Sequence, residues 1–324
     1  MKIRFDFFVI MTIILLVTSA VHLTISSMMI VSPRKISSLS VGDSYSYVRI
    51  VGKVSDTPSI NVENGVVDSI YFKVNDGSGS ATVKIYAPLA EEMYNDGKIP
   101  SLGDHVDVSG IVKVTDTSVS ITLYAEEDLY FEPQKPKKIK IDEASSYDEG
   151  DAVEIEGRIY EINAYSFGYI IAVVDVSSGN RINLSVPYNY EIPDIAELSH
   201  SDVKVVGAIH YYKETVEIIP RVFGGIRVEN IVEYQKTDDL KDLTLYSYVH
   251  LEGKVDYIIS ADSYQLFVLN VGGDRIDVYV ESGANATKVW VSEIVAVRGI
   301  VSIYGGEMEI KVRAYSDDCV EVIS

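Results

Sequence analysis

GDHVDVSGIVKV, residues 103–114, is a stretch in which apolar and polar residues alternate on both sides of a central glycine, Gly110. Alternation with a period of two places successive side chains on opposite faces, so this stretch predicts a half-buried β-strand. The same arrangement recurs around Gly157 and Gly253, and weaker versions surround Gly52, Gly207 and Gly299. The six segments form three pairs, which indicates three copies of one small β-domain.

The glycine inside each strand has a physical reason. Glycine weakens a strand unless the strand bends sharply or another backbone approaches closely. Closing a five-stranded sheet into a small barrel requires such corners. Two bent strands per copy, at the first and fourth positions, therefore favour a small Greek-key barrel over a flat sandwich.

The remaining elements of each copy follow from turn and strand signals. A hairpin is expected around residues 75–79, 177–180 and 272–274, and a short helix at 88–94, 190–198 and 285–291. Proline- and lysine-rich residues 132–140 and mixed-charge residues 233–242 read as solvated linkers. The sequence predicts an all-β chain with barrels at 45–132, 149–231 and 245–324, preceded by an N-terminal segment, residues 1–36.

Residues 7–31 form one apolar run that only Ser, Thr and His22 interrupt. At about 1.5 Å per residue, a helix of this length crosses a hydrocarbon core of ~30 Å. We therefore expect one transmembrane helix acting as an uncleaved signal anchor, with the body outside the cytoplasm. The alternative is a cleaved signal peptide and secretion, with the cleavage site near Ala20.

Composition limits the chemistry of the body. The 324 residues carry a formal net charge of −20, a field that repels polyanions at long range but leaves room for a local basic surface. Cys319 is the single cysteine, which excludes an intramolecular disulfide framework and a multi-cysteine zinc site. The five histidines lie far apart in the sequence, and no phosphate-binding loop or hydrolase motif occurs. We expect no metal, no cofactor and no enzymatic activity.

Each copy resembles an oligonucleotide/oligosaccharide-binding (OB) fold of the type found in tRNA-anticodon-binding and single-strand-binding domains. The residues that carry this resemblance are VRIVGKV at 48–54, FKVNDGSG at 72–79 and GDHVDVSG at 103–110. The second and third copies depart from it, because Asp76-Gly77 becomes Val176-Ser177 and Gly272-Gly273. The resemblance implies ligand binding on the open face of the second and third barrel strands and in the loops beside it.

In the first copy, alternation turns two tyrosines and two lysines outward on those strands, and two further cations are expected on the matching face of the first strand. Aromatic rings stack on bases and cations contact phosphates, which is the composition that a single strand requires. The alternative is an ordinary surface, since exposed strands favour tyrosine. The candidate ligand-binding residues are Arg49, Lys53, Tyr71, Lys73, Lys84 and Tyr86.

The other two copies offer weaker sites. In the second, Tyr160, Tyr169, Arg158 and Arg181 share a face with acidic residues, and in the third the outward residues are largely apolar. An apolar outward face is more typical of packing against a neighbour. Asn285, in Asn285-Ala286-Thr287, is a candidate glycosylation site.

Two functions remain at this point. The first is a membrane-tethered OB-fold binding protein that holds single-stranded nucleic acid, or another extended polymer, mainly through the first copy. The second is an extracytoplasmic structural module, in which the OB folds act as spacers or bind protein or glycan. Salt dependence distinguishes the two, because phosphate contacts weaken as salt rises.

Overall fold

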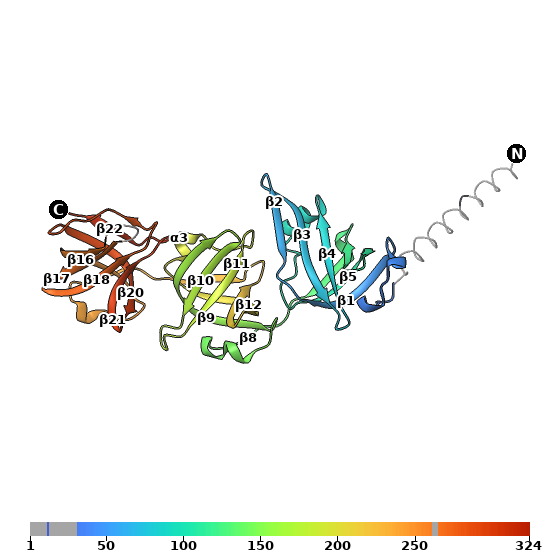
Figure 1. Ribbon diagram of the computed structural model, residues 1–324, viewed down its shortest axis with the longest axis horizontal. Coiled ribbons are helices and arrows are strands. Elements are labelled where there is room, and N and C mark those ends of the chain that lie inside the picture. The colour runs from blue at the N-terminus through green and yellow to red at the C-terminus, as the bar shows by residue number, and fades with distance from the viewer. Residues whose placement is uncertain (1–11, 13–30, 261–264) are drawn as a thin grey trace.

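The computed structural model describes Thr12, residues 31–260 and residues 265–324, and this part of the chain is all-β, with only short helices. Figure 1 shows three β-barrels in a row, with the second between the first and the third. None of the described helices combines the length and the apolar composition needed to cross a membrane. The expected anchor, residues 7–31, lies outside the described residues except for Thr12 and Val31.

The first barrel has the strand order expected of an OB-like fold. Its five strands pair in the order β1-β3-β4-β6-β5, and β1 pairs again with β5 to close the barrel, while β4 and β6 are parallel. Helix α2 (Leu89–Asn95) follows β4 at the position expected for residues 88–94. The barrel strands are β1 (Tyr47–Val54), β3 (Val66–Asn75), β4 (Ser80–Tyr86), β5 (His105–Val114) and β6 (Val119–Thr122).

Two strands of the first barrel lie outside this pattern and were not predicted. Strand β2 (Ser59–Glu63) pairs with β3, and β7 (Leu129–Glu132) pairs with β5. The turn between β2 and β3 is Asn64-Gly65, and both residues have positive φ, 52° and 81°. Asn-Gly between two strands is a strong hairpin signal, so the sequence did contain the information for β2.

The second and third barrels repeat the same order and the same parallel pair. The second comprises β9 (Ala152–Tyr165), β10 (Gly168–Val174), β11 (Arg181–Pro187), β12 (Ser201–Tyr212) and β13 (Thr215–Pro220). The third comprises β16 (Tyr248–Ser260), β17 (Gln265–Val271), β18 (Asp274–Val280), β20 (Ile294–Tyr304) and β21 (Glu307–Val312). Strands β14 (Ile226–Ile231) and β22 (Cys319–Val322) follow the barrels, as β7 follows the first.

Two of the three expected helices need correction. Only α3 (Ile195–Leu198) forms within residues 190–198, because Asp194 caps it by accepting hydrogen bonds from the Ala196 and Glu197 amides. Residues 285–291 form no helix. Strand β19 (Asn285–Ala286) pairs there with β22, and the Thr287 amide donates to the Val320 carbonyl at 3.0 Å.

The segments read as linkers are folded parts of the barrels that follow them. Strands β8 (Lys137–Lys138) and β15 (Gln235–Lys236) pair with β9 and β16, and short 3-10 helices follow them, η4 (Ile141–Ser146) and η5 (Leu240–Asp242). The lysines of residues 132–140 are exposed, as the solvated-linker interpretation expects, but Ile139 is buried and ties the segment to the second barrel. The apolar residues between the charges were the overlooked signal.

The first barrel likewise begins before residue 45. Ile36, in the 3-10 helix η1 (Ile36–Ser38), is 3% exposed and belongs to the core, and η2 (Val41–Asp43) follows it. The Ile36 amide donates to Asp76 Oδ2 at 2.8 Å, in the turn between β3 and β4. Burial opposes ionisation of Asp76, but hydrogen bonds from Ile36 and Ser78 lower its pKa to about 2. This hydrogen bond therefore fixes residue 36, before the first barrel strand, to the turn between β3 and β4.

The six repeated glycines lie where another strand passes closely, as expected. A Cβ at Gly52, Gly110, Gly207, Gly253 or Gly299 would lie 2.4–2.6 Å from a carbonyl oxygen of the neighbouring strand. At Gly157 the nearest carbonyl oxygen would be 2.8 Å away. No side chain fits at such separations without moving a backbone, so glycine is required for barrel closure.

Replacing Gly110 by alanine should lower the free energy of unfolding by about 1–3 kcal/mol or more, because its Cβ would meet the Thr122 carbonyl oxygen at 2.5 Å. Gly42→Ala is the matched control, since its Cβ would meet only Ser40 Oγ, at 3.6 Å. Urea denaturation followed by circular dichroism measures both. Equal stability of the two variants would contradict the closure role of Gly110.

Candidate nucleic-acid interface

Four of the six candidate residues lie together on the outer face of β3 and β4. Tyr71 and Lys73 alternate along β3 with the buried Phe72 and Val74, and Lys84 and Tyr86 alternate along β4 with the buried Val83 and Ile85. The register places Tyr71 directly opposite Lys84. We call these four residues, Tyr71, Lys73, Lys84 and Tyr86, the tyrosine–lysine face.

The two tyrosines of this face contact each other edge to face. Their ring centroids are 5.9 Å apart at an interplanar angle of 85°, and Tyr86 is 44% exposed. A hydrogen bond with the Tyr71 side chain, and secondly burial, raises the pKa of Tyr86. Tyr86 therefore remains neutral near pH 7. An uncharged exposed ring is suited to stacking on a flat ligand group.

The two lysines of the face differ in their partners. Lys73 Nζ lies 2.7 Å from Asp56 Oδ2, and this hydrogen bond raises the pKa of Lys73. Both side chains of the pair are about half exposed, so the pair contributes little and opens easily. Lys84 forms no ion pair with any described residue. The face thus presents one unpaired cation and one that can exchange its partner.

Arg49 does not belong to this face. Gly52 bends β1, so that only Lys53 and Val54 pair with β3, whereas Tyr47 to Lys53 pair with β5. Arg49 therefore faces Asp107 of β5, with Nε–Oδ1 at 2.8 Å and Nη2–Oδ2 at 2.5 Å. This bidentate pair raises the pKa of Arg49 and occupies its guanidinium group.

Lys53 lies at the end of the face, beyond Lys73. It is opposite Asn75 and lines a cavity of about 510 Å³ between the first and second barrels. His105, Glu149 and Asp151 line the same cavity. This acidic setting makes Lys53 a poor phosphate contact for a ligand on β3 and β4.

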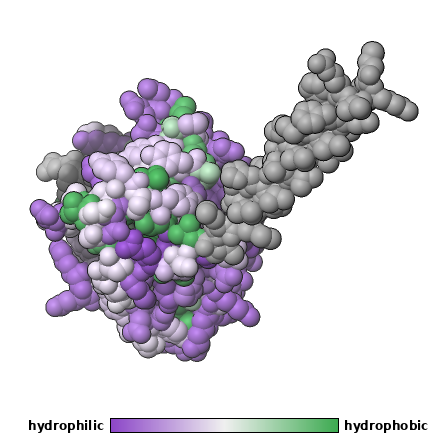
Figure 2. Space-filling model, turned by 90° about the vertical axis from the view of Figure 1, so that its right-hand side faces the viewer, coloured by the Kyte–Doolittle hydropathy of each residue, from purple (hydrophilic) through white to green (hydrophobic). Residues whose placement is uncertain are grey.

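Strand β2 widens the face beyond the predicted residues. Ser59 pairs with Tyr71, and the Asn61 side-chain amide donates to Ser69 Oγ at 3.1 Å. On the other side, β6 pairs with β4 and leads to Tyr124, which is 70% exposed. The surface at this end of the molecule is largely hydrophilic, with only small, separate hydrophobic patches (Figure 2).

One end of the corresponding face of the second barrel packs against the third barrel. Tyr160 is 6% exposed, and the Arg181 guanidinium lies over its ring, 3.7 Å from the centroid, and 5.2 Å from the ring of Tyr246. Arg158 bonds Asp202 at 2.7 Å and donates to the Tyr246 carbonyl oxygen at 3.1 Å. The aromatic and cationic residues predicted there form an interface between barrels.

Tyr169 does not take the outward position that the sequence predicted for it in the second barrel. It is half-buried, packs against the main core and contacts Tyr188 edge to face, with centroids 5.5 Å apart. On the third barrel, the outward residue Val268 is 2% exposed, and Arg275 is paired with Asp256 at 2.6 Å. Neither barrel presents an exposed face comparable with that of the first.

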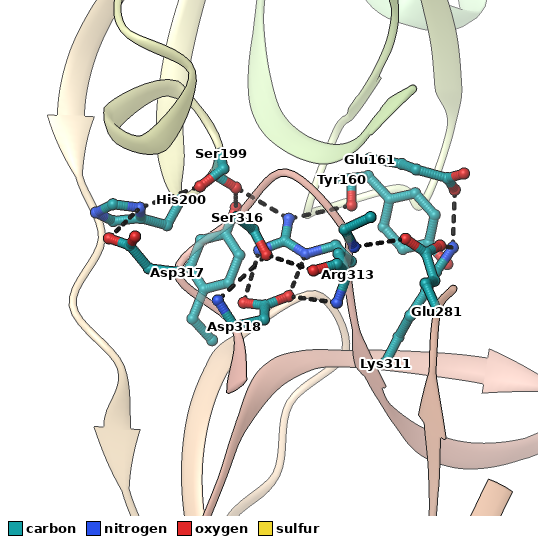
Figure 3. A network of polar contacts seen from close by, with 12 residues as sticks. Tyr160, Glu161, Ser199, His200, Glu281, Lys311, Arg313, Ser316, Asp317 and Asp318 are labelled. Atoms are coloured by element: carbon teal, nitrogen blue, oxygen red, sulfur yellow. Dashed lines mark hydrogen bonds and ion pairs between the residues drawn. The ribbon is translucent and has the colours of Figure 1, made fainter. Parts of the chain in front are cut away.

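A buried ion pair of the third barrel lies against the second barrel (Figure 3). Arg313 and Asp318 are 2% and 0% exposed, with Nε–Oδ2 at 2.6 Å and Nη2–Oδ1 at 3.0 Å. Arg313 Nη1 also donates to the carbonyl oxygens of Tyr160 and Ser199, at 3.2 and 2.9 Å. Burial alone would lower the pKa of Arg313, but the charge and hydrogen bonds of Asp318 raise it.

A lysine of the third barrel, Lys311, forms an ion pair across the same interface. Lys311 Nζ lies 2.8 Å from Glu161 Oε2 and 2.7 Å from Glu281 Oε1 (Figure 3). Burial opposes both charges, but their hydrogen bonds raise the pKa of Lys311 and lower that of Glu161. Tyr248 adds a bond from its hydroxyl group to the Ile159 carbonyl oxygen at 2.6 Å. These contacts hold the second and third barrels together.

Two further predictions concern modification and metals. Asn285 is exposed in β19, where its side chain is accessible to solvent. Across residues 31–260 and 265–324, His, Cys, Asp and Glu side chains nowhere gather in the three-membered groups that hold a metal ion. Cys319 is buried, and burial raises the pKa of its thiol.

No family model and no curated protein matches the chain. Among solved structures, similarity is found to the OB domain of MM0293 from Methanosarcina mazei, with 18% identity, a TM-score of 0.25, and coverage of 29% of this chain and 87% of that one. The hypothetical protein ygiW from E. coli is 22% identical, with a TM-score of 0.22 and coverage of 28% and 90%. A replication protein A heterotrimer bound to single-stranded DNA is 15% identical, with a TM-score of 0.21 and coverage of 28% and 71%. The fold assignment rests on the strand order and not on these similarities.

Proposed function

We propose that this chain is a non-enzymatic binding protein whose first barrel holds single-stranded nucleic acid on the tyrosine–lysine face. The observation that carries the proposal is the contact between the exposed Tyr86 and the half-buried Tyr71, beside Lys73 and Lys84, on the face where OB folds bind ligands. On the second barrel, the end of the same face that carries Tyr160 is buried against the third barrel. The first barrel therefore offers the better-supported binding site.

The chemistry of the face favours binding without sequence preference. Bases stack on the tyrosine rings of the face, a contact worth about 1–3 kcal/mol per base and available to every base. Lys84, and Lys73 once it leaves Asp56, contact phosphates. Ser59 and Asn61 supply uncharged hydrogen-bonding groups at the edge.

The scarcity of cations sets the expected salt dependence. Each phosphate contact on a single strand contributes about −0.7 to the slope of log affinity against log salt. With two lysines on the face, we expect a slope near −1.4, and Lys84→Ala should reduce its magnitude by about 0.7. Lys241→Ala, in η5 of the third barrel, is the control and should leave the slope unchanged. Fluorescence anisotropy with labelled oligo(dT) from low to moderate salt measures both, and an unchanged slope for Lys84→Ala would contradict the phosphate contact.

A neutral glycan is the second candidate. It is favoured by the single unpaired cation of the face, by the net charge of −20, and by the surrounding serine and asparagine side chains. A glycan needs aromatic and hydroxyl contacts without phosphate neutralisation. Binding that does not change with salt, and that single strands do not compete away, supports this candidate instead.

We further propose that residues 7–31 tether the protein to a membrane, with the body outside the cytoplasm. The long apolar run supports the tether. The hydrogen bond between the Ile36 amide and Asp76 would hold the first barrel near the bilayer. The full-length chain should remain in the membrane fraction after an alkaline carbonate wash and should dissolve in detergent. A mature chain in the soluble fraction, with a mass that begins after Ala20, would instead establish secretion after cleavage.

A further inference from the structure

The junction between the first and second barrels contains a groove that is not part of the proposed binding face. Its cavity volume is about 500 Å³, and its walls are β2 with the residues before it on one side and two loops of the second barrel on the other. The ring-bearing residues of those loops are Phe167 and Tyr188. No lining residue is charged, so the groove suits rings and neutral polar groups and not phosphates.

The groove is continuous with the tyrosine–lysine face. Ser59 and Asn61 line it, and the same residues pair with Tyr71 and Ser69 of β3. A chain lying across Tyr86 and Tyr71 therefore passes over β2 directly into the groove. In Figure 1, β2 is the strand of the first barrel that lies toward the second barrel.

The second barrel's aromatic residues are held in place before any ligand arrives. Phe167 stacks on Tyr165, with centroids 5.5 Å apart and an interplanar angle of 10°, and it is 52% exposed. Tyr188 is 42% exposed, packs edge to face on Tyr169, and its amide donates to the Phe167 carbonyl oxygen at 3.1 Å. Rings fixed in this way lose little freedom when a base stacks on them.

The walls of the groove are also fixed relative to each other. The Asn189 side-chain amide donates to the Ile60 carbonyl oxygen at 2.9 Å, and the Tyr190 hydroxyl group donates to the Pro58 carbonyl oxygen at 3.1 Å. Tyr94 of the first barrel donates to the Asn189 carbonyl oxygen at 2.8 Å. These bonds join the free edge of β2 to the loop that carries Tyr188.

We propose that a single strand bound to the first barrel continues over β2 into this groove, where its bases stack on Phe167 and Tyr188. The inference rests on the proposed function and extends it. It gives the second barrel a role in binding through its loops. It also predicts a ligand footprint longer than one barrel supplies.

The test compares short and long strands on full-length protein in detergent. A single OB fold accommodates from about 4 nucleotides upward, so oligo(dT) of about 4 and about 12 nucleotides separates the two regions. Phe167→Ala and Tyr188→Ala should each weaken binding of the longer strand about five- to 150-fold, the range for one stacked base. Binding of the shorter strand should not change, and neither should the salt slope for the longer strand, since the groove holds no charge.

Control variants separate the outcomes. Tyr304→Ala, at an 80% exposed tyrosine of the third barrel, should affect neither strand, and Phe167→Tyr should retain binding of the longer strand. One outcome is that Phe167→Ala and Tyr188→Ala leave binding of the longer strand unchanged while Tyr86→Ala weakens binding of both strands. That outcome would overturn the extension and leave the proposed function intact. If the unaltered protein binds neither strand at low salt, both the proposed function and its extension are contradicted.

Discussion

Replacing Asp318 by alanine is expected to lower the free energy of unfolding by about 3–5 kcal/mol, the cost of leaving a buried charge without its partner. Arg313 would keep its position between the second and third barrels with only carbonyl oxygens as partners. Tyr234 would also lose the acceptor that its hydroxyl group bonds at 2.6 Å. Thermal and urea unfolding measure the loss.

Two further variants show whether the loss arises from the buried charge. Lys236→Ala removes an exposed pair with Glu252 and should cost about 0–1 kcal/mol. The double variant Arg313→Met, Asp318→Leu removes both charges and should recover much of the loss. A double variant no more stable than Asp318→Ala would mean that shape and not charge determines the effect.

The second large effect is expected at the binding face. Tyr71→Ala and Tyr86→Ala should each weaken single-strand binding by about 1–3 kcal/mol, or roughly five- to 150-fold, through loss of one stacked base. The two rings contact each other, so the double variant should fall short of the sum. Titration of labelled oligo(dT) at low salt measures the losses.

The matched control for these substitutions is Tyr130→Ala. Tyr130 is 62% exposed in β7, which pairs with β5 and not with β3 or β4. Tyr71→Phe and Tyr86→Phe keep the ring and should retain most of the affinity. A loss in Tyr130→Ala equal to that in Tyr86→Ala would contradict a defined site on the tyrosine–lysine face.

The repeated glycines made the barrels predictable from the sequence. Gly52, Gly110 and their counterparts are local signals, because the need for glycine follows directly from the approach of the adjacent strand. Alternation along β3 and β4 likewise predicted which side chains of those strands share a face. Strand β2 was missed although Asn64-Gly65 marks its hairpin, since the alternation in β2 is short.

The full composition of the site was not predictable from alternation alone. The bend at Gly52 divides β1 between two partner strands, so Arg49 faces β5 and leaves the face that strict alternation assigns to it, whereas Lys53 stays at the end of that face opposite Asn75. The burial of Tyr160 depends on how the third barrel packs, which no local pattern records. The folded linkers were misread because lysines masked the buried Ile139.

The most direct measurement of the central claim is a titration of full-length protein in detergent with labelled oligo(dT) at low salt, beside the Tyr71→Ala, Tyr86→Ala double variant. We predict saturable binding that weakens with salt at a slope near −1.4, and a loss in the double variant of at least tenfold. The absence of binding at low salt, or equal binding by the double variant, would contradict single-strand recognition by the first barrel.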